Sequence, residues 1–355
     1  MIDRIHQLIK RSETPPDSVI ELLSNTLIGT EGMLYQLMDT KTKIHELVDP
    51  HFLYMERNGK AIGNITICER PITLNDQKQD SLYIRYFAFD TIFQGGSEKG
   101  RSNSSFHTYF KSLFETSNFD PLDPESKKSI YWAFIDPQNM RSFNMNERFG
   151  FQTIGRFHTY SFSRITPKKI SSVERLQHHD KEEVKLLIQE FYKDFNFYSD
   201  VHLFDHDNFF VLRQKGEIVA GIQTNPVRFN IKNLPGASGK LLIKLLPVIP
   251  GMRKLINPKE HKFLATEGIF WKKGFEDKIQ GLLEGTLFLT QHHSMLLWVD
   301  DQNKMLEDLN IRWGIIQKTK KNNAINIVAK FNGFEKNEID KVYSAKKYLS
   351  GFDMT

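Results

Sequence analysis

The chain has 355 residues, of which 39% are hydrophobic and 26% charged, a composition that is typical of globular proteins and excludes fibrous and disordered ones. Its length predicts about two domains, and its 48 Lys and Arg against 43 Asp and Glu give a net charge too small to indicate a nucleic-acid partner. The single cysteine, Cys68, excludes an intramolecular disulfide and a cysteine-built metal site, and it favours a cytoplasmic setting.

The first half of the chain predicts strands alternating with helices, which indicates an α/β or α+β fold. Its expected elements are, in chain order, a strand over 5–10, a helix over 17–27, a hairpin over 52–65, a strand over 81–89, a Gly- and Lys-rich loop over 94–102, a helix over 106–114 and a strand over 130–135. The last helix is the best patterned, because five aromatic or aliphatic residues between Phe106 and Phe114 fall on one face.

The second half predicts the same elements in the same order. They are a strand over 172–176, a helix over 181–191, a hairpin over 209–222, a strand over 262–270, a loop over 271–275, a helix over 275–287 and a strand over 295–299. The two hairpins turn at Asn58-Gly59 and Lys215-Gly216, and both glycines tolerate the positive φ of such turns.

A longer motif also occurs twice with identical spacing. Its first copy is Asp136, Gln138, Asn139, Asn146, Arg148, Phe149, Gly150 and Phe151, and its second is Asp300, Gln302, Asn303, Asn310, Arg312, Trp313, Gly314 and Ile315. The repeat predicts a duplication with one domain over 1–165 and another over 170–355, joined by a polar connection at 166–169. The second domain is predicted to carry an insert near 229–258.

These motifs resemble the GNAT acyltransferase superfamily, in the tandem form of the mycothiol synthase and N-myristoyltransferase types. The match is closest from Asn139 to Phe151, where the family has an Asn, a small residue (here Ser142) and then Arg-apolar-Gly-Phe. The resemblance implies an α/β (α+β) fold of two tandem GNAT-like domains, each a mixed sheet flanked by helices. The family's R/Q-x-x-G-x-G/A signature is matched only loosely, at 94–102.

The resemblance also implies acetyl-CoA or another acyl-CoA as the acyl donor. Backbone N–H groups at a helix N-terminus bind a pyrophosphate, and glycines let the backbone approach it. The first half is the better candidate because its loop has several glycines beside cations, although the same loop also fits an ordinary polar connection. The implied donor-binding residues are Phe87, Phe89, Gly95, Gly96, Ser97, Lys99, Gly100, Arg101, Ser102 and Asn139.

Asn146 and Asn310 stand where the family often has a Tyr that protonates the leaving thiolate. An amide cannot donate a proton in this way, so the sequence predicts that neither half keeps that acid. Candidate general bases are the carboxylates Asp90, Asp136 and Glu267, each of which also fits a solvated or capping carboxylate.

Three further features have a structural explanation as well as a functional one. His202 and His206 would face alike on a helix, but no metal-ligand pattern accompanies them, so surface or capping roles are favoured and no metal is expected. Cys68 is expected to be a buried, inert thiol. The apolar run 241–252 fits a membrane-surface segment, a lid or a helix packed on the second domain; the last is favoured, and no membrane partner is expected.

The sequence thus predicts an N-acyltransferase, by implication an acetyltransferase, in which a small-molecule or peptide amine attacks the acyl-CoA thioester directly. The alternative is a duplicated binding module that has lost its chemistry, which the Asn at both Tyr positions favours.

Overall fold

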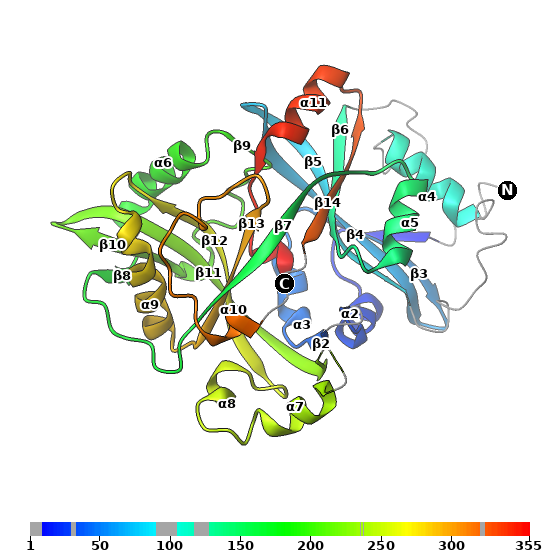
Figure 1. Cartoon of the computed structure of the whole chain (residues 1–355). Helices are drawn as coiled ribbons and strands as arrows, with labels where there is room; N and C mark the ends of the chain where they lie inside the picture. The colour runs from blue at the N-terminus through cyan, green and yellow to red at the C-terminus, as the bar shows by residue number, and fades with distance from the viewer. Residues whose placement is uncertain are drawn as a thin grey trace.

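The computed structural model describes residues 9–29, 33–89, 105–116, 128–234, 236, 238–319 and 324–355. Within these residues, thirteen strands form one mixed sheet, in the order β1-β3-β4-β5-β6-β14-β7-β13-β12-β11-β10-β8, with β2 paired to β11 (Figure 1). Their bounds are Ile9–Ser12 (β1), Leu34–Leu37 (β2), Pro50–Arg57 (β3), Lys60–Leu74 (β4), Gln77–Phe89 (β5), Ser129–Ile135 (β6), Gln152–Ser163 (β7), Val173–Arg175 (β8), Phe209–Gln214 (β10), Glu217–Asn233 (β11), His261–Trp271 (β12), Ser294–Asp300 (β13) and Ile325–Asn332 (β14). A separate parallel pair joins β9 (Phe195–Asn196) to β15 (Lys346–Lys347).

The sheet is continuous between the two halves because they exchange strands at its centre. β14, from the second half, lies between β6 and β7 of the first half and is antiparallel to both. β7 in turn is antiparallel to β13 of the second half. Read from either edge, the strands occur in corresponding positions, with β5 and β6 of the first half matching β12 and β13 of the second. The boundary near 163–171 remains a prediction.

Helices cover the sheet, and the predicted apolar faces point into it. The helices are α2 (Asp17–Asn25), α3 (Thr40–Lys43), α4 (Ser105–Thr116), α5 (Met140–Arg148), α6 (Lys181–Phe191), α7 (Gly239–Leu245), α8 (Met252–Leu255), α9 (Ile279–Thr290), α10 (Ile315–Thr319) and α11 (Lys336–Ser344). Phe110, Leu113 and Phe114 of α4 are buried in one core cluster with residues of β4, β5 and β6. Among the described residues, no helix is both long and apolar enough to cross a membrane.

Both predicted hairpins form, and their turns have the expected backbone. Asn58 and Gly59 have φ of 51° and 74°, and Lys215 and Gly216 have φ of 51° and 87°. This left-handed backbone matches the twist of the flanking strands. In the strand order, β3–β4 and β10–β11 each begin one strand in from an edge of the sheet, so the two hairpins occupy corresponding places.

The two copies of the repeated block differ in local structure. Asn139 caps α5, and its side chain accepts a hydrogen bond from the Ser142 amide at 3.1 Å. Asn303, its counterpart in the second copy, caps no helix and instead closes a turn by accepting from the Met305 amide at 3.1 Å. Ile315 likewise begins the short helix α10 rather than a strand.

Candidate functional site

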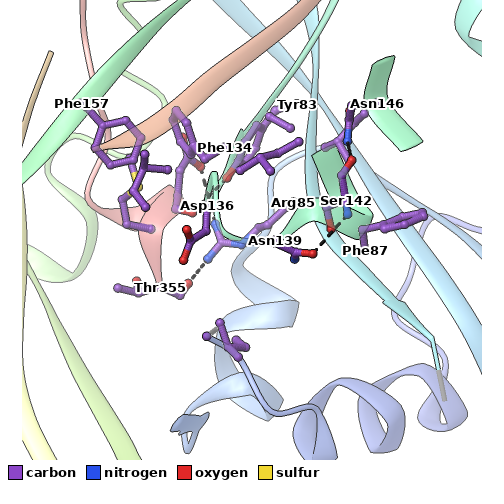
Figure 2. Close-up of a pocket in the computed structure, with 18 of the residues that line it drawn as sticks. Tyr83, Arg85, Phe87, Phe134, Asp136, Asn139, Ser142, Asn146, Phe157 and Thr355 are labelled. Carbon is purple, nitrogen blue, oxygen red and sulfur yellow. Dashed lines mark hydrogen bonds and ion pairs between the residues drawn. The ribbon is translucent and has the colours of Figure 1, made fainter. Parts of the chain in front are cut away.

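A cavity opens where two parallel strands of the first half separate. β5 and β6 pair only from Ser81 to Tyr83, opposite 130–132, although β5 continues to Phe89 and β6 to Ile135. Beyond the pairing lies a cavity of about 590 Å³, which extends across the centre of the sheet to side chains of the second half (Figure 2). This volume is within the range of sites that enclose a drug-sized ligand, roughly 300–1,000 Å³.

The wall of the cavity is mainly apolar, is rich in phenylalanine and comes from both halves of the chain. Eight phenylalanines line it: Phe87, Phe110, Phe114, Phe134, Phe149, Phe157, Phe229 and Phe263. Phe229 on β11 stacks on Tyr35 of β2 with their ring centroids 4.2 Å apart, so the N-terminal region closes the second-half end of the cavity. Such a wall favours an apolar ligand group over a charged one.

Polar groups line one side, at the end of β6 and along α5. Asp136 follows β6, and its Oδ1 accepts a hydrogen bond from the Gln138 amide at 2.9 Å. Asn139 and Asn146 also line the cavity, and the Asn146 amide donates to the Ser142 carbonyl at 2.8 Å (Figure 2). Burial, together with the nearby Asp136, raises the pKa of Tyr35 to about 12, so this phenol keeps its proton at neutral pH.

Arg85 is the one cation among the described residues of the wall. Its side chain is almost fully buried, and Nη2 donates to a main-chain oxygen of Thr355 (Figure 2). Its Nη1 lies 3.6 Å from Asp353 Oδ1, too far for a hydrogen bond, and neither Nη1 nor Nε has a hydrogen-bond partner among the described residues. Both atoms are buried, so at the cavity wall the guanidinium contributes mainly its positive charge.

Arg85 lies beside a cluster of buried polar residues that includes Asp353 and Arg70. Asp353 forms an ion pair with Arg70, and Tyr83 donates to the Asp353 carbonyl at 2.9 Å. Lys43 donates to the Thr355 hydroxyl at 2.9 Å, and burial, followed by the nearby Arg85, lowers its pKa to about 8. These contacts fix the residues beside the cavity, since buried polar groups are costly to leave unpaired.

The corresponding gap in the second half is filled by the chain itself. β12 and β13 also pair in parallel over only two residues, 264–265 with 295–296. The space beyond is about 20 Å³, and residues 347–349, at the end of β15 and just after it, are among those that line it. There the Lys347 amide donates to Asp300 at 3.1 Å, and Ser350 donates to Glu267. As far as the described residues show, the first-half gap is the one of the two with room for a substrate.

The predicted site residues fall in three places. Phe87, Asp136 and Asn139 line the cavity, while Phe89 lies next to Phe87 with ring centroids 5.1 Å apart. Glu267 is not brought to this cavity: it is buried in the second-half gap, where burial raises its pKa. The remaining predictions lie outside the described residues, and they are Asp90, Gly95, Gly96, Ser97, Lys99, Gly100, Arg101 and Ser102.

Sequence reasoning missed Arg85 and the contribution of the second half. Arg85 could have been found from the sequence, because it shares a strand face with Tyr83 and Phe87. It is also the one charged residue in the predicted strand over 81–89. Phe229 and Phe263 had none, since core phenylalanines look the same in sequence as cavity-lining ones.

His202, His206 and Cys68 do not line the cavity. His202 is buried and lies 3.1 Å from Arg70 Nη2, whereas His206 is exposed, so the two do not face alike. Cys68 is buried as predicted, and burial raises its thiol pKa to about 11.

Comparison by sequence finds nothing: no family model matches the chain, and no curated protein does. Comparison by structure finds N-myristoyltransferase from Saccharomyces cerevisiae with bound myristoyl-CoA, at a TM-score of 0.55 and 10% identity over 93% of this chain and 86% of that chain. The same enzyme with bound myristoyl-CoA and inhibitors matches at a TM-score of 0.54 and 11% identity, over 91% and 80% of the two chains. At this identity the likeness concerns the fold. The predicted α/β class is confirmed: the chain has the mixed α/β fold of N-myristoyltransferase, with strands in corresponding positions in its two halves.

Proposed function

We propose that the protein is an acyl-CoA-dependent N-acyltransferase whose first half holds the thioester. The observation that carries the proposal is the Phe-lined cavity between the diverging strands β5 and β6, at the one such gap that is open. The likeness to a myristoyl-CoA-bound enzyme supports the same donor class. The expected pyrophosphate loop over 94–102 follows the end of β5 in the sequence after four residues.

The cavity favours an acyl group longer than acetyl, which departs from the acetyl donor that the sequence favours. A two-carbon group would leave most of the 590 Å³ unfilled, and contacts along an apolar chain are worth about 0.8 kcal/mol for each buried CH₂. Phe110, Phe114 and Phe149 lie together in the first-half core at this wall and offer such contacts.

We assign the acceptor amine to the other end of the cavity, between the two halves. Phe229, Phe263 and Trp298 belong to the second half, and Tyr35 closes the same end. An amine that enters at this end would reach the thioester carbonyl carbon without passing the coenzyme A part of the donor. The acceptor's chemical identity, small molecule or peptide, is left to the experiment below.

In the proposed reaction the amine nitrogen attacks the thioester carbonyl carbon, the new C–N bond forms, and the C–S bond then breaks to release the thiolate. Asp136 takes the proton that the nitrogen loses. The carbonyl oxygen gains negative charge, which Arg85 and the edge N–H groups of β5 beyond its pairing with β6 stabilise. With Asn146 in place of the family's Tyr, the thiolate leaves without that acid, as its moderate pKa permits.

The test is thiol release from acyl-CoAs of increasing chain length in the presence of a panel of amines and N-terminal peptides. We expect release with medium or long chains to exceed that with acetyl-CoA. Ala133→Phe narrows the cavity, so it should shift the preference toward shorter chains and lower kcat/KM for the longest by about tenfold.

Ala329→Phe is the matched control, because Ala329 is an equally buried strand residue that does not line the cavity. It should lower stability without changing the chain-length preference. If no acyl-CoA in the panel supports release while one still binds, the alternative of a binding module replaces this proposal.

A further inference from the structure

The insert of the second half exposes apolar side chains that the sequence predicted to be packed. β11 ends at Asn233, and α7 and α8 then project from the lower edge of the molecule in Figure 1. Leu246 and Leu255 anchor this hairpin by burial. Five large apolar residues in the span of nine remain exposed: Leu241, Leu242, Leu245, Val248 and Ile249.

The same segment is strongly basic. Residues 234–259 contain five Lys or Arg and no Asp or Glu, so their charge equals the net charge of the entire chain. Lys244, Arg253 and Lys254 are exposed, and none forms an ion pair with another described residue. A segment with this charge repels a second copy of itself and attracts an anionic surface.

A basic hollow adjoins α8. It has a volume of about 210 Å³ and is lined by Arg253, Lys254, Asn257, Glu260, His261, Lys262, Gln291, His292 and His293. Its one acid, Glu260, is already paired with Arg228 at 3.5 Å and Lys262 at 3.3 Å. Phosphate-sized anions therefore meet cationic donors beside the exposed apolar residues.

We propose that the α7–α8 hairpin docks the protein on anionic phospholipid bilayers. Val248 and Ile249, 75% and 46% exposed, enter the headgroup–acyl boundary, while Arg253 and Lys254 contact lipid phosphates. The exposed side chains of the hairpin distinguish it from an ordinary surface helix, whose apolar side chains pack inward. This docking replaces the expectation of no membrane partner.

Docking would place the cavity close to the lipid. Phe229, at its second-half end, lies four residues before the end of β11, or about 13 Å along the strand. Lipid binding itself does not depend on the proposed acyl transfer, so the two can fail separately.

The test is cosedimentation of the full chain with vesicles of phosphatidylserine and phosphatidylcholine, and with vesicles of phosphatidylcholine alone. We expect binding to the anionic vesicles that weakens as salt rises. Arg253→Glu/Lys254→Glu and, separately, Val248→Asp should each lower the partition coefficient at least tenfold. Acyl transfer to a soluble amine should be unchanged in both, because none of these residues lines the cavity.

The controls carry the same chemical change at other exposed sites. Lys60→Glu/Lys273→Glu matches the charge reversal, and Leu186→Asp, on α6, matches the apolar one. Both should bind vesicles as the unaltered chain does. The proposal is overturned if the unaltered chain does not bind anionic vesicles, if the controls lose binding equally, or if Val248→Asp instead dissociates a dimer in sedimentation velocity.

Discussion

Arg85 is the residue on which the proposed chemistry depends most directly. Replacing it by Met removes the one cation among the described residues of the cavity wall. We expect Arg85→Met to lower kcat/KM for acyl transfer by about 10²-fold, the usual effect of losing one group that stabilises a developing oxyanion.

Arg70→Met is the control for this prediction, since Arg70 forms an ion pair with the same Asp353 but does not line the cavity. It should lower the free energy of unfolding while the turnover of the folded fraction changes little. Equal losses of turnover in both variants would mean that Arg85 only supports Asp353.

Variants of Asp136 and Asn146 distinguish a residue that acts as the general base from one that only supports the local structure. If Asp136 accepts the amine proton, Asp136→Asn should lower turnover by roughly 10²–10⁴-fold. Asn146→Ala removes a hydrogen bond to Ser142 and should cost only about 1 kcal/mol of stability. Thiol release that is unaffected by Asp136→Asn would identify this carboxylate as the turn cap seen in its bond to Gln138.

The lowered pKa of Lys43 predicts that the free energy of unfolding depends on pH. Burial lowers its pKa from 10.5 to about 8, so between these values the unfolded chain binds more protons than the folded one. The contribution of this group to the unfolding free energy should therefore rise with pH over that window, in total by on the order of 3 kcal/mol.

We expect this rise to be absent in Lys43→Met, measured by urea unfolding at steps between pH 7.5 and 10.5. The exposed Lys60→Met should keep it. A parallel pH profile in Lys43→Met and the unaltered chain would show that Lys43 titrates normally.

At the scale of elements, local patterns predicted most strands and the helices α2, α4, α6 and α9, but they missed elements such as β14 and α11. α6 spans Lys181–Phe191, as the sequence predicts, because its apolar stripe and its length are local properties. Asn303 has the same motif as Asn139 yet caps no helix, since Leu306 and Leu309 are drawn into the core beside α9. A repeated motif thus fixed the position of an element without fixing its conformation.

Two glycines of the second half, Gly351 and Gly281, predict opposite effects of a Gly→Ala change on stability. A Cβ on Gly351 would collide with the backbone carbonyl of Thr266, so Gly351→Ala should destabilise the chain by about 1–3 kcal/mol. Gly281, in α9, has space, and Gly281→Ala should stabilise it by about 0.4–1 kcal/mol.

Chemical denaturation of both variants would check these signs. A stabilising Gly351→Ala would indicate that residues 347–352 can leave the gap between β12 and β13 at little cost.

For the whole molecule, the exchanged strands predict that neither half folds alone. Without β14 the fragment 1–165 loses the strand between β6 and β7, and 170–355 loses β7 beside β13. We expect each isolated fragment to lack a cooperative thermal transition, and coexpression to restore one. Cooperative unfolding of 1–165 by itself would show that the exchange is dispensable.

The sequence by itself determined the α/β class, the two hairpins, most of the strands and helices such as α6 and α9. These follow from periodicity, turn residues and caps, all of which act between near neighbours. Tertiary structure alone decided that the first-half gap is open, that residues 347–349 fill the other, and that Phe229 and Arg85 share one cavity. It also decided that the apolar run near Val248 faces outward. The physical reason is that a side chain's exposure depends on which distant segment packs against it, and no local pattern encodes that partner.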